Sequence, residues 1–154
     1  ALDKYVAEQG EFLTNKIKNM IVENPDIINK QKKDIIYVIS PFKNVAYQLS
    51  KELNKIEFTR YDKKGKPTNI GTVHTFQGKE APIVFFVLGA DKKCIGAANW
   101  AVGTDNPNIM NVAVTRAKEE FYIIGDKEMY LSLNSDVIND TCKIIEKHNM
   151  NTSL

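Results

Sequence analysis

Six consecutive apolar residues, Ile83 to Leu88, constrain the fold of this 154-residue chain more than any other feature. The run has no polar break and is rich in β-branched and aromatic side chains, which is typical of a strand buried on both faces. Strands of this kind occur in parallel sheets that are covered by helices on both sides. The run therefore predicts the central strand of a parallel sheet in an α/β domain.

A dense polar segment, Thr72 to Glu80, comes directly before this run. Hydroxyl, imidazole, amide and charged side chains beside a buried strand are costly unless they bond to something at the rim of the sheet. In open α/β sheets the rim at the strand ends is also where ligands bind. We therefore expect this segment to carry a functional site.

Strand-like and helix-like patterns alternate along the rest of the chain. Further strands are expected at Ile35–Ile39, Ile56–Tyr61 and Phe121–Ile124, and Asn69–Val73 leads into the polar segment. Helices are expected from about Glu8 to Glu23, from Pro41 to about Lys55, from Pro107 to Ala117, and from Ser135 onward. This alternation predicts one domain, a three-layer α/β sandwich with a mostly parallel sheet flanked by helices.

The loop after the first predicted strand carries a helix-start signal, because Ser40 is a good N-cap residue and Pro41 suits the first helical position. The free amides at such a helix start favour an anion such as a phosphate. Ser40 and Lys43 are therefore candidates for a nucleic-acid contact. The alternative is that Ser40 only caps its helix.

Composition narrows the class of function. A net charge of +2 with 26% charged residues is close to balanced, so any nucleic-acid site must be local. The two cysteines, Cys94 and Cys142, are far apart in sequence, and no Cys-x-x-Cys spacing occurs, so neither a metal site nor a disulfide framework is expected. The chain has no run of about 18 to 20 apolar residues and no signal pattern. We expect a cytoplasmic protein without a membrane partner.

Three segments resemble motifs of superfamily 1 helicases. Thr-x-His-x-x-Gln-Gly-x-Glu at Thr72–Glu80, followed by an apolar strand, resembles motif V. Asn-Val-Ala-Val-Thr-Arg-Ala-Lys at Asn111–Lys118 resembles motif VI, and Ile35–Phe42 resembles motif IV. The motifs stand in the expected order and spacing. The sequence of the segment that resembles motif V is most similar to the Upf-like and Dna2-like branch.

The resemblance implies the second, C-terminal RecA-like motor domain of a helicase, which has a P-loop NTPase-type fold without the P-loop. ATP with Mg²⁺ would be held mainly by the N-terminal RecA-like domain of the same protein. Arg116 would be the arginine finger, and Glu80, Gln77 and Gly78 would face the nucleotide. Single-stranded DNA or RNA would be contacted by Thr72, His74, Thr75 and Ser40.

Structural alternatives stand beside several of these roles. His74 could be a satisfied buried histidine, and Thr72 and Thr75 could be ordinary strand residues. Trp100 could stack on a base, although pinning a loop to the core is the better reading of a lone tryptophan. The lysines of the Asp62–Pro67 turn could track phosphates, although such a cluster is more often a solvated loop tip.

The departures from the family pattern limit what the chain can do alone. No Gly-x-x-x-x-Gly-Lys-Ser/Thr loop (Walker A) occurs, and no Asp-Glu pair (Walker B) follows a buried strand. The family's arginine before motif IV has no counterpart either. We expect a part of a longer protein with negligible ATPase activity of its own. A non-hydrolysing RecA-like binding module is the alternative function, and another P-loop-type enzyme is disfavoured by the missing loop.

Overall fold

The computed structural model describes residues 5–89 and 108–125. Within this part of the chain, four strands form one sheet in the order β2-β1-β3-β4, and every neighbouring pair is parallel. The strands are β1 (Ile36–Ile39), β2 (Ile70–Gly71), β3 (Ala81–Val87) and β4 (Ala117–Ile124). The apolar run thus forms β3, between β1 and β4, and the prediction of a central parallel strand is confirmed.

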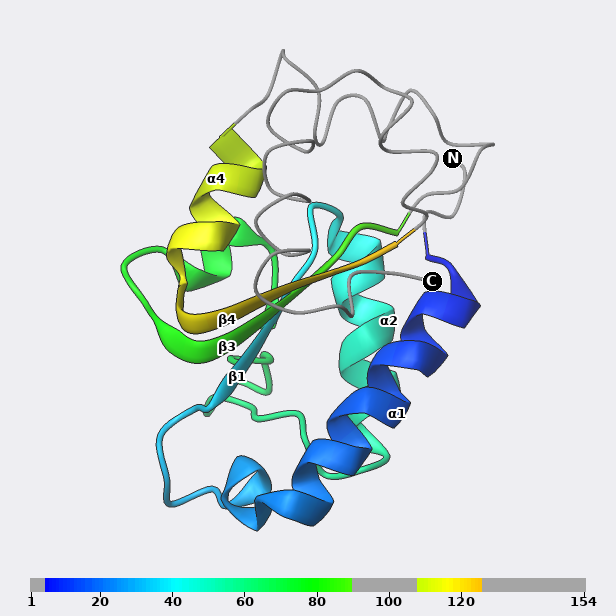
Figure 1. Cartoon of the computed structure of the whole chain (residues 1–154), viewed down its shortest axis with the longest axis vertical. Coiled ribbons are helices and arrows are strands. Elements are labelled where there is room, and N and C mark those ends of the chain that lie inside the picture. The colour runs from blue at the N-terminus through cyan, green and yellow to red at the C-terminus, as the bar shows by residue number, and fades with distance from the viewer. Residues whose placement is uncertain (1–4, 90–107, 126–154) are drawn as a thin grey trace.

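Helices cover the sheet from two sides (Figure 1). They are α1 (Ala7–Glu23), α2 (Lys43–Asn54) and α4 (Asn108–Thr115), with short 3₁₀ helices η1 (Pro25–Ile28) and η2 (Val73–Phe76). The connection from β1 to β2 moves along the sheet in the opposite direction to the connection from β3 to β4. Because such connections are right-handed, α2 and α4 lie on opposite faces. The predicted α/β arrangement, a parallel sheet flanked by helices, is confirmed.

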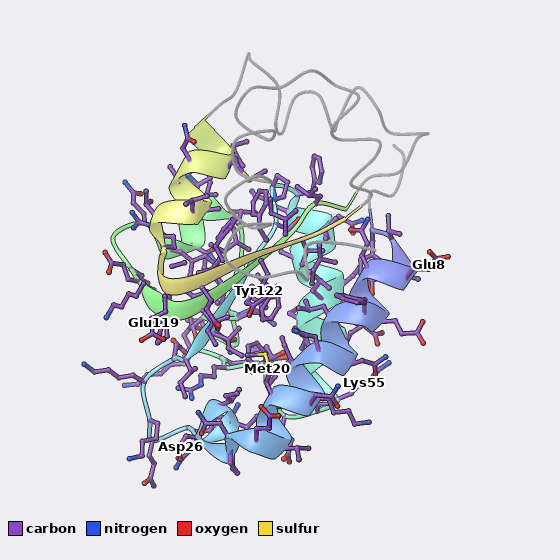
Figure 2. The ribbon with its side chains drawn as sticks, in the orientation of Figure 1. Glu8, Met20, Asp26, Lys55, Glu119 and Tyr122 are labelled. Atoms are coloured by element: carbon purple, nitrogen blue, oxygen red, sulfur yellow. The ribbon has the colours of Figure 1, made fainter. Side chains whose placement is uncertain are left out.

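Aromatic pairs fill the two faces of the sheet. On the α1 side, Phe85 stacks on Tyr122 with ring centroids 5.0 Å apart, and the Lys16 ammonium lies 5.5 Å from the centroid of the same tyrosine ring. Figure 2 labels Tyr122 and Met20 in this region. On the other face, Phe86 stacks on Phe121 at 6.1 Å. These contacts explain why β3 is apolar at every position along its buried length.

The prediction from sequence of how α2 begins was wrong. Ser40 is not the N-cap, because the helix begins at Lys43 and its N-cap is Phe42. The Ser40 N–H donates to the Gly71 carbonyl at 2.9 Å, so the chain still follows the sheet at this residue. The Ser40 hydroxyl oxygen instead accepts the Phe42 N–H at 3.3 Å, and the bend at Pro41 precedes the helix.

Two strand predictions also require correction. Residues Ile56–Tyr61 form no strand, because the Asn69 side chain accepts the Arg60 N–H at 2.9 Å and donates to the Phe58 carbonyl at 2.9 Å, where a neighbouring strand would otherwise bond. The alternative that Thr72 and Thr75 are ordinary strand residues is also wrong, because β2 ends at Gly71 and Thr75 lies in η2. At the other end, Ala117 belongs to β4 rather than to the preceding helix.

Several predictions lie outside the described residues. They concern Trp100, the helix-start signal at Asp105–Pro107, the two cysteines and the last helix from Ser135. Among the residues that the structure does describe, no helix is long and apolar enough to cross a membrane.

Candidate functional site

The predicted site residues divide between the two ends of the sheet. Since all four strands are parallel, they begin at one common edge, the amino edge, and end at the other, the carboxyl edge. Ser40 follows β1 and Thr72 follows β2, and the bond from the Ser40 N–H to the Gly71 carbonyl holds these two segments side by side at the carboxyl edge. Glu80 and Arg116 precede β3 and β4, at the amino edge.

At the carboxyl edge, His74 is exposed and Thr72 is half-buried. The exposure of His74 excludes the reading of a buried, satisfied histidine. Thr75 is half-buried and packs on β2, because a Cβ added at Gly71 would collide with the Thr75 side chain. Ser40 is buried and its hydroxyl orders the following loop. The side chains most open to a ligand here are therefore those of His74 and Thr72.

A tight turn follows η2 and leads to β3. The Lys79 N–H donates to the Phe76 carbonyl at 2.9 Å, Gln77 has φ −56° and ψ 122°, and Gly78 has φ 76°. These angles define a type II turn, whose third residue needs positive φ and is therefore glycine. Gln77, Gly78, Lys79 and Glu80 are all exposed. The Gln-Gly-Lys-Glu sequence thus presents its polar side chains at the amino edge.

Arg116 is held next to this turn by the backbone. Its N–H donates to the Ala113 carbonyl at 3.1 Å at the end of α4, and its carbonyl accepts the Ala81 N–H at 3.0 Å. Ala81 directly follows Glu80, so the start of β4 and the end of the turn are joined. Glu80 and Arg116, predicted separately from two motifs, are brought to adjacent positions at the amino edge.

The Arg116 side chain lies across the turn. Its Nη1 donates to the Phe76 carbonyl at 3.3 Å, and its Nη2 donates to the Thr115 hydroxyl oxygen at 3.1 Å. The buried Nε has no hydrogen-bond partner, and no ion pair involves this guanidinium within residues 5–89 and 108–125. Of its five N–H donors, two bond within the chain and one is buried, which leaves one N–H on each terminal nitrogen for an anion. An uncompensated guanidinium with free donors fits a phosphate group.

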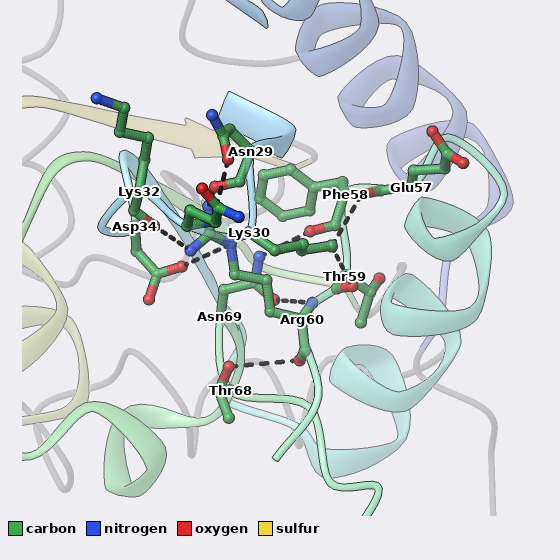
Figure 3. A network of polar contacts seen from close by, with 11 residues as sticks. Asn29, Lys30, Lys32, Asp34, Glu57, Phe58, Thr59, Arg60, Thr68 and Asn69 are labelled. Atoms are coloured by element: carbon green, nitrogen blue, oxygen red, sulfur yellow. Dashed lines mark hydrogen bonds and ion pairs between the residues drawn. The ribbon is translucent and has the colours of Figure 1, made fainter. Parts of the chain in front are cut away.

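The other arginine, Arg60, builds a network that the sequence reading did not assign (Figure 3). Its Nη1 donates to the Lys32 carbonyl at 2.6 Å, its Nη2 donates to the Asn29 carbonyl at 2.8 Å, and its Nε lies 3.3 Å from an Asp34 carboxylate oxygen. The planar guanidinium can bond in three directions at once, which a lysine cannot. The sequence signal that could have indicated this role is that arginine is rare in a chain so rich in lysine.

Asp34 connects this network to the turn electrostatically. Burial raises the pKa of its carboxyl, and the charges of Arg60, Lys79 and Lys30 oppose that rise. Lys79 belongs to the turn, so the carboxylate and the turn lie close enough to interact. Lys30 also ties the loop before β1 to the loop before β2, since its ammonium donates to the Glu57 and Thr59 carbonyls at 3.1 and 3.0 Å.

The lysines of the Asp62–Pro67 turn are exposed. One Asp62 carboxylate oxygen accepts the Lys64 and Lys66 N–H groups at 2.8 and 2.9 Å, and a bridge joins Tyr61 to Pro67. The predicted polar turn is confirmed, and the exposure agrees with a solvated loop tip. Within the described ranges, no group of three or more His, Cys, Asp or Glu residues is arranged to hold a metal ion.

Comparisons with known proteins match this chain to a family model and to a helicase. The AAA_12 family model, described as an AAA domain, matches residues 5–128. Helicase sen1 of Schizosaccharomyces pombe is 30% identical over 130 residues, and the match covers 82% of this chain. It covers 7% of that helicase, so the chain spans a small part of the relative's length.

Proposed function

Because the chain belongs to the AAA_12 family, the C-terminal helicase domain of superfamily 1 Upf-like helicases, we propose that it is the second RecA-like motor domain of an ATP-dependent DNA or RNA helicase or translocase. The observation that carries the proposal is the Arg116 guanidinium, which has no carboxylate partner among the described residues and lies beside the exposed turn that ends in Glu80. Its place in the motor is opposite the N-terminal RecA-like domain, which holds most of the ATP and Mg²⁺.

Arg116 supplies charge stabilisation to phosphoryl transfer. Its free N–H donors bond the phosphate oxygens on which negative charge is concentrated, which is the role of an arginine finger. ATP with Mg²⁺ supplies the reactive phosphoryl group when bound. The residues of this chain can contact ATP but cannot hold it alone. The sequence includes neither a phosphate-binding Gly-rich loop nor a carboxylate pair for Mg²⁺.

The turn positions the remaining nucleotide contacts. Gly78 fixes the type II geometry, and Gln77 and Glu80 stand exposed on either side of it. In the proposed motor, Glu80 bonds the ribose hydroxyls or takes part in the γ-phosphate network. The bond between the Ala81 N–H and the Arg116 carbonyl keeps Glu80 in register with the arginine.

The carboxyl edge takes the single strand. Hydroxyl and imidazole donors suit contacts to phosphate and sugar, which position a strand without reading its sequence. His74 and Thr72 make these contacts, and Thr75 and Ser40 support the loop that carries them. Because either DNA or RNA offers the same phosphates, the donors alone do not select between them.

Residues Thr72–Glu80 connect the two ends of the sheet. The segment starts at the carboxyl edge, passes through η2, and reaches the amino edge as the turn before β3. Phe76 anchors its middle, since its ring lies 4.5 Å from the Tyr37 ring and its carbonyl accepts both the Lys79 N–H and an Arg116 N–H. A shift of Arg116 on nucleotide binding would therefore act on the segment that carries His74.

The test is ATP hydrolysis by the full-length protein, measured with and without single-stranded DNA or RNA. Stimulation by either strand supports the motor, and the better stimulating strand identifies the substrate. A well-folded full-length protein without hydrolysis would instead be a non-hydrolysing RecA-like binding module.

A further inference from the structure

The outer face of α2 carries three exposed residues at regular spacing: Lys43, Tyr47 and Lys51. Residues four apart lie on the same side of a helix, so these three form one row, the α2 stripe. The opposite side of α2 is buried in the core through Val45, Ala46, Leu49 and Leu53. Tyr47 is 59% exposed, which makes it one of the few large apolar side chains left open in the described residues.

The α2 stripe is positively charged and has an aromatic ring at its centre. The Lys51 ammonium lies 5.3 Å from the centroid of the Tyr47 ring, a cation–π contact. Within the described part of the chain, neither Lys43 nor Lys51 is paired with a carboxylate. Lys55, on the outer surface in Figure 2, differs because its ammonium lies 3.1 Å from a Glu52 carboxylate oxygen.

The stripe begins at the carboxyl edge near Thr72, on the opposite face of the sheet from η2, because α2 packs with α1 and η2 packs with α4. Lys43 is the first residue of α2 and stands three positions after Ser40, whose N–H is bonded to the carbonyl directly before Thr72. At the helical rise of about 1.5 Å per residue, Lys51 lies about 12 Å farther along the helix. A strand that leaves the carboxyl edge over the start of α2 would meet Lys43, Tyr47 and Lys51 in turn.

We propose that the α2 stripe extends the path of single-stranded nucleic acid beyond His74 and Thr72, with Tyr47 stacking on one base and Lys43 and Lys51 binding the flanking phosphates. The proposal rests on the proposed function, which places a single strand at the carboxyl edge. An exposed aromatic ring with lysines on both sides has the chemistry of sequence-independent single-strand binding. A duplex would not engage Tyr47 in this way, because its bases are already stacked on one another.

The experiment measures the affinity of the full-length protein for single-stranded DNA and RNA oligonucleotides by fluorescence anisotropy. Tyr47→Ala should weaken binding about tenfold, because loss of an aromatic ring removes base stacking. Tyr47→Phe should bind like the wild type, since the ring is retained. Tyr61→Ala is the matched control, because Tyr61 is 47% exposed but does not belong to α2, and it should leave affinity unchanged.

Salt dependence tests the lysines separately. Lys43→Ala and Lys51→Ala should each reduce the slope of log affinity against log salt by about 0.7, the value for one lost phosphate contact on a single strand. Lys55→Ala should leave the slope unchanged, because its ammonium is already paired with Glu52. Equal slopes for all three variants would overturn the phosphate contacts.

The outcomes separate this proposal from the proposed function. If the protein binds single strands and His74→Ala weakens that binding while Tyr47→Ala does not, the α2 stripe is no part of the path and the function stands. If Tyr47→Phe loses as much affinity as Tyr47→Ala, stacking is overturned. If the wild-type protein binds no single strand, the function and the stripe both fail.

Discussion

Replacing Arg60 with lysine should destabilise the fold, although the charge is kept. The guanidinium bonds the Lys32 and Asn29 carbonyls and pairs with Asp34, on three sides of one plane. A lysine has its donors on one nitrogen at the end of a flexible chain and can satisfy about one of these partners. The loops before β1 and before β2 would then lose most of the contacts that Arg60 makes between them.

The expected cost is about 2 kcal/mol. Two hydrogen bonds from a charged donor are lost, and such bonds contribute about 1.5–3 kcal/mol each when buried. The Arg60 side chain is only 13% exposed, but the two carbonyls lie on an exposed loop where water can replace the donor, which lowers the cost to about 1 kcal/mol each. The same free energy corresponds to a fall in melting temperature of about 4–8 °C for a domain of this size.

Urea unfolding of the 154-residue chain measures this cost, as a lower midpoint at an unchanged m-value. Arg116→Lys is the matched control, because it changes the only other arginine, which donates to a single backbone carbonyl at 3.3 Å. It should lower stability by less than about 0.5 kcal/mol. An Arg60→Lys chain within about 0.5 kcal/mol of the wild type would refute the reasoning.

Two further predictions concern a carboxyl group and a ligand contact. Because burial raises the pKa of Asp34 above its ordinary 3.8, the folded chain binds this proton more tightly than the unfolded chain does. The contribution of Asp34 to the free energy of unfolding therefore falls as pH rises from 3.8 through the raised pKa. Asp34→Asn should remove this fall when urea unfolding is measured at a series of pH values. An identical pH dependence in wild type and variant would contradict this assignment. His74→Ala should weaken single-strand binding by the full-length protein to a similar extent for every sequence tested, and unchanged affinity at low salt would count against the contact.

Local signals predicted the centre of the fold, but not the type of turn that precedes β3. The unbroken apolar run marked β3 because a strand buried on both faces needs apolar residues at every position. Gly78 sits where a type II turn requires positive φ, which the Gln-Gly sequence allows. The motif resemblance indicated Arg116 and Glu80, and the pairing of β3 with β4 brings them to one edge.

The features that sequence reasoning missed depend on distant partners. The carbonyls bonded by Arg60 are 28 and 31 residues away, and nothing near Arg60 in sequence points to them. The alternating pattern around His74 is typical of a strand. The chain direction must reverse after β2, however, because β3 runs in the same direction as β2, and η2 lies in that reversal. Ser40 looked like a helix cap, yet its N–H is still engaged with β2.

The most direct measurement of the central claim is ATP turnover by the full-length protein with Arg116→Ala, in the presence of a stimulating single strand. The finger role predicts a rate lower by a factor of about 10³ or more, with ATP binding largely retained, because the arginine acts on charge that develops in the transition state. Equal turnover in wild type and variant would contradict the assignment of Arg116 and the account of the amino edge built on it.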